Sequence, residues 1–240
     1  MKTTKIQILL ALFVLLFGTS SCLDEMFIEG NGITRTETRN AEGFNEIASN
    51  GDFTVTIMPG NSYSVEITAE SNLLPYISTN VDGKTLKIRT TGIHSLRQTE
   101  PIEIYITTPV LNGLSLSGSG LIETENFLSS DFDISVSGSG DIKTKISSNT
   151  VKANVSGSGT ISIEGSATNT NFVISGSGKI KTYNLLQEQC QAAISGSGDM
   201  YINVNQTIDA RISGSGRVYF VNHPIIRTSI SGSGNVVDKN

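Results

Sequence analysis

Hydrophobic and polar residues alternate along the second half of the chain in a repeat of 18 to 20 residues. Each repeat is centred on Ser-Gly-Ser-Gly, which begins seven times between residues 117 and 231 at spacings of 20, 19, 19, 20, 18 and 18 residues. An apolar residue precedes every copy, and another stands five residues after its first serine. Apolar side chains at every second position are typical of a β-strand with one buried face. Each repeat is therefore predicted to hold one strand that enters the motif and one that leaves it.

A second turn is predicted between successive copies, where the sequence is polar at 129–131 and 147–149. Strands with this period and no helical pattern are typical of a β-solenoid with one coil per repeat. With rungs roughly 4.8 Å apart, the seven copies predict a rod segment about 30 Å long. The alternative is a meander of antiparallel hairpins with the motif as the loop. Near-identical motifs favour the solenoid, because stacked corners gain from matching one another.

Fourteen of the 24 glycines lie inside the motifs, so the glycine excess is structural and does not mark a flexible linker. Glycine at a stacked corner provides either a positive φ or space for the neighbouring backbone. The motif serine hydroxyls are expected to hydrogen-bond along the axis. The predicted structural glycines are Gly118, Gly120, Gly138, Gly140, Gly157, Gly159, Gly176, Gly178, Gly196, Gly198, Gly214, Gly216, Gly232 and Gly234.

Residues 41–116 also alternate, but less regularly, and are predicted to form an N-terminal β cap or the first part of the solenoid. Asp82-Gly83 between two alternating runs predicts a hairpin. Residues 71–74 predict a short helical turn that ends at Pro75. At the other end, the last motif leaves a strand edge that charges or a partner must shield.

The first 21 residues have the pattern of an export signal. Two lysines precede an apolar run over residues 6–17, which is shorter than the roughly 20 residues of a membrane-spanning helix. Small residues then lead to Cys22, and this arrangement resembles the lipobox of bacterial lipoproteins. The resemblance implies that Cys22 is lipidated and attaches the protein to a membrane. An ordinary secretory signal is the alternative.

Asp24 and Glu25, directly after the cysteine, resemble the surface-export tags of some Gram-negative lipoproteins. They imply an exported protein, lipid-anchored to the outer membrane and facing the cell surface. The predicted organisation is a signal peptide (1–21), a tether (22–40), one solenoid domain (41–236, with the repeats at 117–236) and a tail (237–240).

The chain over about residues 40–236 resembles the DUF2807 family, the "putative auto-transporter adhesin, head GIN domain". The resemblance implies an all-β, right-handed β-helical fold and an envelope-associated protein, with no established catalytic residues. It rests on Phe44, Ile47, the strand from Gly51 to Ile57, the segment from Tyr63 to Ile67, Leu73-Leu74-Pro75, Asp82 to Ile88 and the iterated motif.

Composition narrows the functional classes. Apolar residues make up 37% of the chain, enough for a core, so disorder is disfavoured. The net charge of −5 argues against a nucleic-acid partner. Two cysteines and two histidines are a poor set of metal ligands. If Cys22 carries lipid, Cys190 is unpaired, and we expect it to be buried as a small hydrophobic residue.

The residues around the motif do not predict a catalytic or cofactor site. The motif lacks the lysine and following helix of a phosphate-binding loop. Lys179 and Arg217 occupy the column after the motif, which a ladder of calcium ions would not tolerate. Asp141 and Asp199 share that column three rungs apart, roughly 14 Å, too far for a glycosidase pair. The charges alternate along the rungs instead, as with Glu123 beside Lys143. We therefore predict no enzyme, metal or cofactor.

One candidate binding patch remains. Tyr183, Tyr201 and Tyr219 fall on three consecutive rungs at positions predicted to point outward. Such a row can stack on sugar rings or contact a protein, although tyrosine is also ordinary on strand surfaces. We therefore expect a lipid-anchored surface adhesin or binding module with an unknown protein or glycan ligand. The alternatives are an envelope component that forms a homo-oligomer through the exposed solenoid end, and a polysaccharide-processing enzyme.

Overall fold

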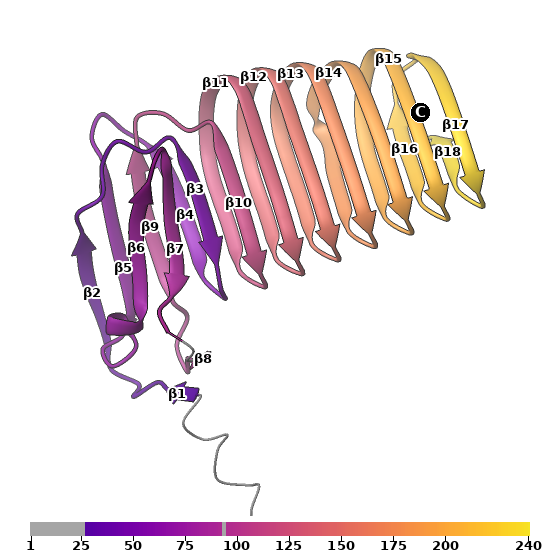
Figure 1. The fold of residues 1–240 in the computed structure, drawn as a ribbon. Helices are drawn as coiled ribbons and strands as arrows, with labels where there is room; N and C mark the ends of the chain where they lie inside the picture. Colours follow the sequence, from indigo (N-terminus) through magenta and orange to yellow (C-terminus); the bar gives the residue numbers. More distant parts are fainter. Residues whose placement is uncertain (1–26, 93–94) are drawn as a thin grey trace, which may run out of the picture.

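Parallel strand pairing winds the repeat region into a β-solenoid, which excludes the antiparallel meander. The computed structural model describes residues 27–92 and 95–240. Each repeat pairs in parallel with the next, and the first glycine of every motif lies in register with that of its neighbours (Figure 1). The repeat strands are β10 (Gly113–Gly118), β11 (Leu121–Gly138), β12 (Asp141–Gly157), β13 (Thr160–Gly176), β14 (Lys179–Gly196), β15 (Asp199–Gly214), β16 (Arg217–Val221), β17 (Ile225–Gly232) and β18 (Asn235–Asp238).

The predicted second turn is a bend within one long strand. Strands β11 to β15 each run for 16 to 18 residues from one motif to the next. The prediction of two separate strands per repeat is therefore wrong for these coils, whereas the last repeat does hold two strands, β16 and β17. The strand bends where two successive side chains point outward, as at Tyr183 and Asn184, and the register shifts there absorb differences in repeat length.

Both glycines of each motif lie close to the backbone of the preceding coil, and the first is needed for its φ as well. The first has a φ between 113° and 126° in all seven copies, a region that residues with a Cβ rarely adopt. The second lies against the preceding coil, and a Cβ on Gly140 would lie 2.6 Å from the carbonyl oxygen of Gly120. Backbone amides bond across this contact, as Ser158 N does to Gly138 O at 2.9 Å. The axial bonds predicted for the serine hydroxyls do not form among the described residues.

Stacked apolar side chains fill the interior. The side chains five residues after the first serine of the motif form one such column, in which each residue faces its equivalent on the next rung. Buried threonines have hydrogen-bond partners inside the solenoid. The Oγ1 atoms of Thr124 and Thr144 lie 2.7 Å apart, and Thr182 Oγ1 donates to the carbonyl oxygen of Tyr201 at 3.0 Å. The buried members of this column are Ile122, Ile142, Ile161, Ile180, Met200 and Val218.

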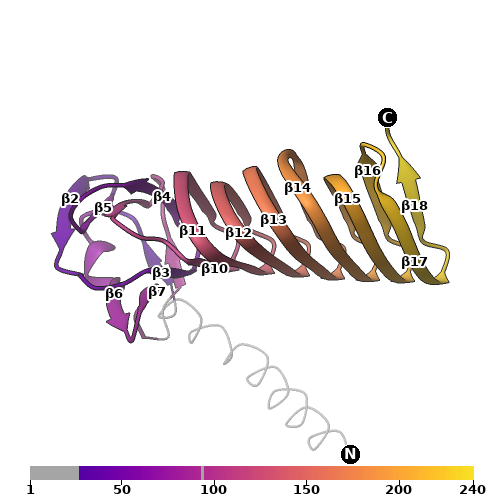
Figure 2. The same cartoon turned by 90° about the horizontal axis from the view of Figure 1, so that it is seen from above.

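The N-terminal portion both begins the solenoid and closes its end. Strands β3 and β4 pair in parallel with β10 and β11, so they form the first coil. Strands β7 and β9 add to β3 and β4 in parallel, and antiparallel strands then extend the sheet beyond them. Strands β6 and β7 form the predicted hairpin around Gly83. We call residues 27–112 the head (Figures 1 and 2). Its elements are β1 (Phe27–Glu29), β2 (Thr34–Arg39), β3 (Glu46–Asn50), β4 (Thr54–Pro59), β5 (Ser64–Glu70), a 3-10 helix (Leu74–Tyr76), β6 (Ile77–Asp82), β7 (Thr85–Thr90), β8 (Ser95–Arg97) and β9 (Glu103–Thr108).

Two expectations for the head need correction. Pro75 lies inside the 3-10 helix and does not end the helical turn, because proline fits the first turn of a helix, where no amide partner is needed. The segment 22–40, predicted to be a tether, contains strands β1 and β2, which pair with β8 and β5. The signal peptide and Cys22 lie outside the described residues. In the described part of the chain, no helix is long and apolar enough to cross a membrane.

A buried carboxylate fixes β2 and the β8–β9 connection to the head. Glu70 accepts hydrogen bonds from Gly32 N at 2.6 Å, from Thr99 N at 2.9 Å and from Thr99 Oγ1 at 2.7 Å. Burial favours the neutral acid, but these hydrogen bonds favour the charged form more strongly. The pKa of Glu70 is therefore lower than its ordinary value.

We expect Gly140→Ala to lower the free energy of unfolding by about 1–3 kcal/mol, because the new methyl group overlaps the backbone of Gly120. Urea denaturation monitored by circular dichroism measures the change. The control is Ser139→Ala, an exposed residue of the same corner, which should shift stability by less than about 0.5 kcal/mol. Equal effects of the two substitutions would contradict the stacked-corner account.

Glu70→Gln should lower Tm by several degrees at pH 7, because a neutral amide cannot replace the charged acceptor. A carboxylate with a lowered pKa stabilises the fold above its unfolded pKa of about 4.3, and that stabilisation is lost as pH falls further. The Tm difference between wild type and variant should therefore shrink below about pH 4. The exposed Glu66 on the same strand provides the control, Glu66→Gln, with little expected effect at either pH.

Candidate functional site

The three predicted tyrosines form a contiguous aromatic row on the outer face of the solenoid. Tyr201 on β15 pairs in register with Tyr219 on β16, and their rings stack with centroids 5.0 Å apart at an interplanar angle of 14°. Tyr183 on β14 meets Tyr201 edge-on, with centroids 5.7 Å apart at 81°. Lys239 Nζ lies 5.4 Å from the centroid of Tyr219 at the other end of the row. We call these three residues the tyrosine row.

The bend of β14 explains the position of Tyr183. Lys181, not Tyr183, is the register partner of Tyr201. The pairing of β14 with β15 shifts after Thr182, where the strand turns, and this shift carries Tyr183 to the edge of the Tyr201 ring. Tyr183 is 37% exposed, whereas Tyr201 and Tyr219 are half-buried. The row therefore presents the Tyr183 ring to solvent.

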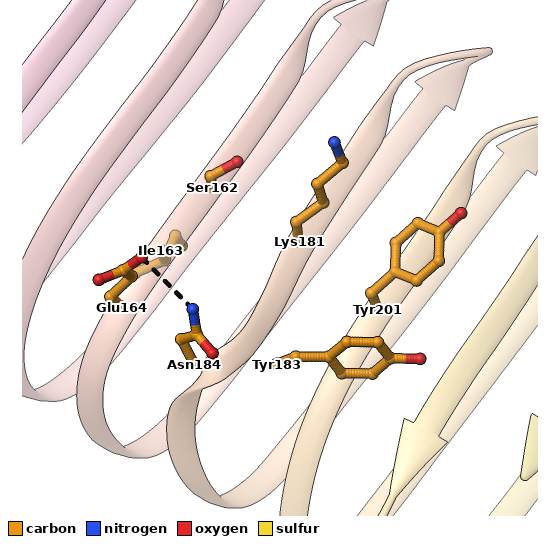
Figure 3. A pocket seen from close by; sticks show the side chains of 7 residues that line it. All are labelled: Ser162, Ile163, Glu164, Lys181, Tyr183, Asn184 and Tyr201. Carbon is orange, nitrogen blue, oxygen red and sulfur yellow. Dashed lines mark hydrogen bonds between the residues drawn. The ribbon is translucent and has the colours of Figure 1, made fainter. Parts of the chain in front are cut away.

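A hollow of about 380 Å³ lies beside the row, across strands β13 to β15. Its polar residues carry both signs of charge, with Glu164 on one strand and Lys181 on the next. Asn184 Nδ2 donates to Glu164 Oε1 at 3.4 Å, which joins the two strands at the rim (Figure 3). The residues that line it are Ser162, Ile163, Glu164, Lys181, Tyr183, Asn184 and Tyr201.

A second hollow of about 260 Å³ adjoins the first, since Ser162 and Glu164 line both. Charge pairs between neighbouring coils line its far side. Lys143 Nζ lies 2.9 Å from Glu123 Oε1, as the sequence predicted, and Lys145 Nζ lies 3.4 Å from Glu125 Oε2. The two hollows follow one another along the rod, the first aromatic and the second charged. We call the pair the tyrosine groove.

Two tyrosines and one lysine of the groove have raised pKa values, so the two phenols are neutral and the ammonium group is charged at neutral pH. Burial, and then the neighbouring tyrosines, raise the pKa of Tyr183, and burial followed by Asp199 raises that of Tyr201. The hydrogen bond to Glu123 raises the pKa of Lys143. The groove therefore offers neutral phenols, ammonium groups and carboxylates, which suit hydrogen bonding and stacking.

The other residues considered from sequence do not assemble into a reactive site. Asp141 and Asp199 are separated by the rungs of Thr160 and Lys179, as predicted. Cys190 is buried against Thr170, and burial raises the pKa of its thiol to about 12, so it is protonated at neutral pH. Among residues 27–92 and 95–240, no three His, Cys, Asp or Glu side chains are grouped as metal ligands.

His223, the histidine in the described part of the chain, does not line the groove. His223 is exposed in a corner before Pro224, as predicted, and His94 lies outside the described residues. Sequence reasoning missed Glu164, Lys181 and Asn184 as neighbours of the tyrosines. Counting back one repeat from Tyr201 does identify Lys181, but the shift in register that places Asn184 beside Glu164 has no sequence signal.

Three solved structures share this fold. A "putative adhesin" from Bacteroides fragilis is 24% identical, with a TM-score of 0.84 over 88% of this chain and all of its own. A "putative lipid binding protein" from Parabacteroides distasonis is 25% identical, with a TM-score of 0.77 over 89% of this chain and all of its own. A second "putative adhesin" from that species is 20% identical, with a TM-score of 0.70 over 89% of this chain and all of its own. No curated protein matches the chain.

The family model for DUF2807, "Putative auto-transporter adhesin, head GIN domain", matches residues 43–224. The match includes the head from before β3 onward and the solenoid as far as the turn after β16. The family and two of these neighbours are named as putative adhesins, the third is named as a lipid binding protein, and none of them is named as an enzyme. An adhesin-like family suggests a cell-surface or exported protein. This chain belongs to the DUF2807 family.

Proposed function

We propose that this protein is a non-enzymatic surface adhesin that binds an extended glycan chain in the tyrosine groove. The observation that carries the proposal is the tyrosine row beside an open, two-stranded rim of hydrogen-bonding groups. The exposed face of Tyr183 can stack on a sugar ring, and Glu164, Lys181 and Asn184 lie within the same hollow to bond hydroxyl groups. A groove open along the rod suits a chain better than a single small molecule.

Lipidation at Cys22 is part of the proposal. Cys22 precedes Phe27 of β1 by five residues, a span of at most about 18 Å when fully extended. A lipid at Cys22 would therefore hold the head close to the membrane, with the acidic residues after the cysteine supporting a place on the outer surface. The less favoured alternative, a polysaccharide-processing enzyme, has no support from the separated carboxylates Asp141 and Asp199.

Tyr183→Ala and Tyr201→Ala should each weaken glycan binding by about 2- to 10-fold, the range of one lost aromatic contact. A glycan array with residues 27–240 identifies the best oligosaccharide, and calorimetry then compares the variants. Tyr105→Ala is the control, because Tyr105 is similarly exposed (40%) but lies on β9 of the head. The proposal fails if no glycan binds, or if Tyr105→Ala weakens binding as much as the groove variants do. If the groove binds a protein and no glycan, its ligand is a protein and the glycan proposal is wrong.

Cys22→Ala should release the protein from the membrane fraction, because the alanine cannot carry the lipid. Metabolic labelling with a fatty acid, followed by fractionation, measures the loss. On intact cells, added protease should cleave the wild-type protein without permeabilisation. If protease cleaves the protein only after the outer membrane is opened, the proposed surface location is contradicted. The proposed lipid anchor is tested separately, by the labelling and fractionation.

A further inference from the structure

The end of the solenoid opposite the head is an uncovered sheet edge. Strand β17 pairs only with β15, and β18 pairs only with β16, so the outer edges of both strands carry unpaired backbone groups. Every residue of β17 is exposed. This last coil lies at the far end of the rod from β1 and β2 (Figures 1 and 2). We call β17 and β18 the terminal rung.

Apolar side chains of the core reach solvent at the terminal rung. Ile226 and Ile230 continue the interior columns of Ile208 and Ile212, which are buried one rung earlier. Yet Ile226 is 38% exposed and Ile230 is 41% exposed. In a solenoid each rung covers its neighbour, so these side chains lack the cover that every interior rung receives. An unpaired edge with apolar side chains is a template for pairing with another chain.

The head end also has strands that pair on one side only, β2 and β6, but their exposed side chains are mostly polar or charged. There the antiparallel strands β2, β5 and β6 extend the sheet, and Leu73, Leu74 and Ile77 are fully or almost fully buried beneath them. A copy of the chain therefore cannot add its terminal rung to the head in the way that one coil adds to the next. Contact between terminal rungs uses the same surface twice, forms a two-fold pair and stops at two copies.

The chemistry of the terminal rung suits a second copy of itself. Antiparallel pairing places residues of the same face opposite one another, and a pair of β17 strands centred on Thr228 sets Ile226 of one copy opposite Ile230 of the other. The charged residues of this rung, Arg227 and Asp238, have opposite signs, so the two ends do not repel as like charges. The second copy thus covers the exposed isoleucine side chains and provides hydrogen-bond partners for the unpaired backbone groups of β17.

The contact is small. An eight-residue strand is about 26 Å long, and packed sheets lie about 10 Å apart, so with side chains each end contributes on the order of 400 Å². Together the two ends bury on the order of 800 Å², below the usual 1,200–2,000 Å² of stable complexes. A weak pair of this kind gains strength when many copies face one another on two surfaces.

We propose that the terminal rung binds the terminal rung of a second copy, tail to tail, and that this contact joins two cells that carry the protein. Tail-to-tail pairing puts the two heads at opposite ends of a doubled rod. Since the proposed anchor at Cys22 lies next to the head, the two lipids then enter opposite membranes, and the partner of this adhesin is a copy of itself. The bridging step rests on the proposed lipid anchor, whereas the pairing itself does not.

Sedimentation of residues 27–240 between about 1 and 500 μM tests the pairing. We expect a monomer–dimer equilibrium that Ile226→Lys and Ile230→Lys abolish. Leu128→Lys is the matched control, because Leu128 is 77% exposed on β11, away from the terminal rung, and this variant should dimerise like wild type. A monomer at every concentration, growth into longer oligomers, or equal loss in Leu128→Lys would overturn the proposal.

Beads test the bridging. The same protein is biotinylated at either terminus and loaded on streptavidin beads, so that neither lipid nor glycan is involved. Beads that hold the N-terminus should clump, and they should disperse with Ile230→Lys but not with Leu128→Lys. Beads that hold the C-terminus should stay apart, because the terminal rung then faces the bead. Clumping in both orientations or in neither would overturn bridging, and neither result bears on the tyrosine groove.

Discussion

Close backbone contact at the glycine corners holds each coil of this protein to the next. The carbonyl oxygen of one corner accepts hydrogen bonds from the amides of the following corner, as Gly138 does from Ser158. A Cβ at the second glycine would occupy the place of the neighbouring backbone. Because corners can stack only in register, residues at the same distance from the motif form columns along the rod. The apolar core is one consequence of this register.

The outer surface is another consequence. Rungs repeat at roughly 4.8 Å, which is close to the distance at which two rings stack, and Tyr201 and Tyr219 do so at 5.0 Å. The same spacing pairs Lys143 with Glu123 on the neighbouring coil. Side chains fixed on a paired backbone lose little freedom when a ligand binds, so the tyrosine groove is a preorganised surface. The bend in β14 departs from the strict repeat and gives the groove its exposed ring.

The two ends of the rod differ because a repeat structure satisfies every coil except the outermost ones. At the head, antiparallel strands and the buried Glu70 complete the first coil and close it. At the terminal rung, the backbone edge and Ile230 remain uncovered. An anchored end, a ligand-binding side and a self-binding tip can thus occupy separate parts of one elongated molecule.

The sequence alone determined the solenoid, because the motif and the alternation around it recur at every rung and a periodic pattern predicts a periodic structure. It also placed the hairpin at Asp82-Gly83, the burial of Cys190 and the rungs of the tyrosines. Only the tertiary structure decided that one bent strand replaces two, that Asn184 meets Glu164, and that backbone amides bond the corners where serine hydroxyls were expected. These features depend on local shifts of register and on strand curvature, which arise from packing between coils and leave no period in the sequence.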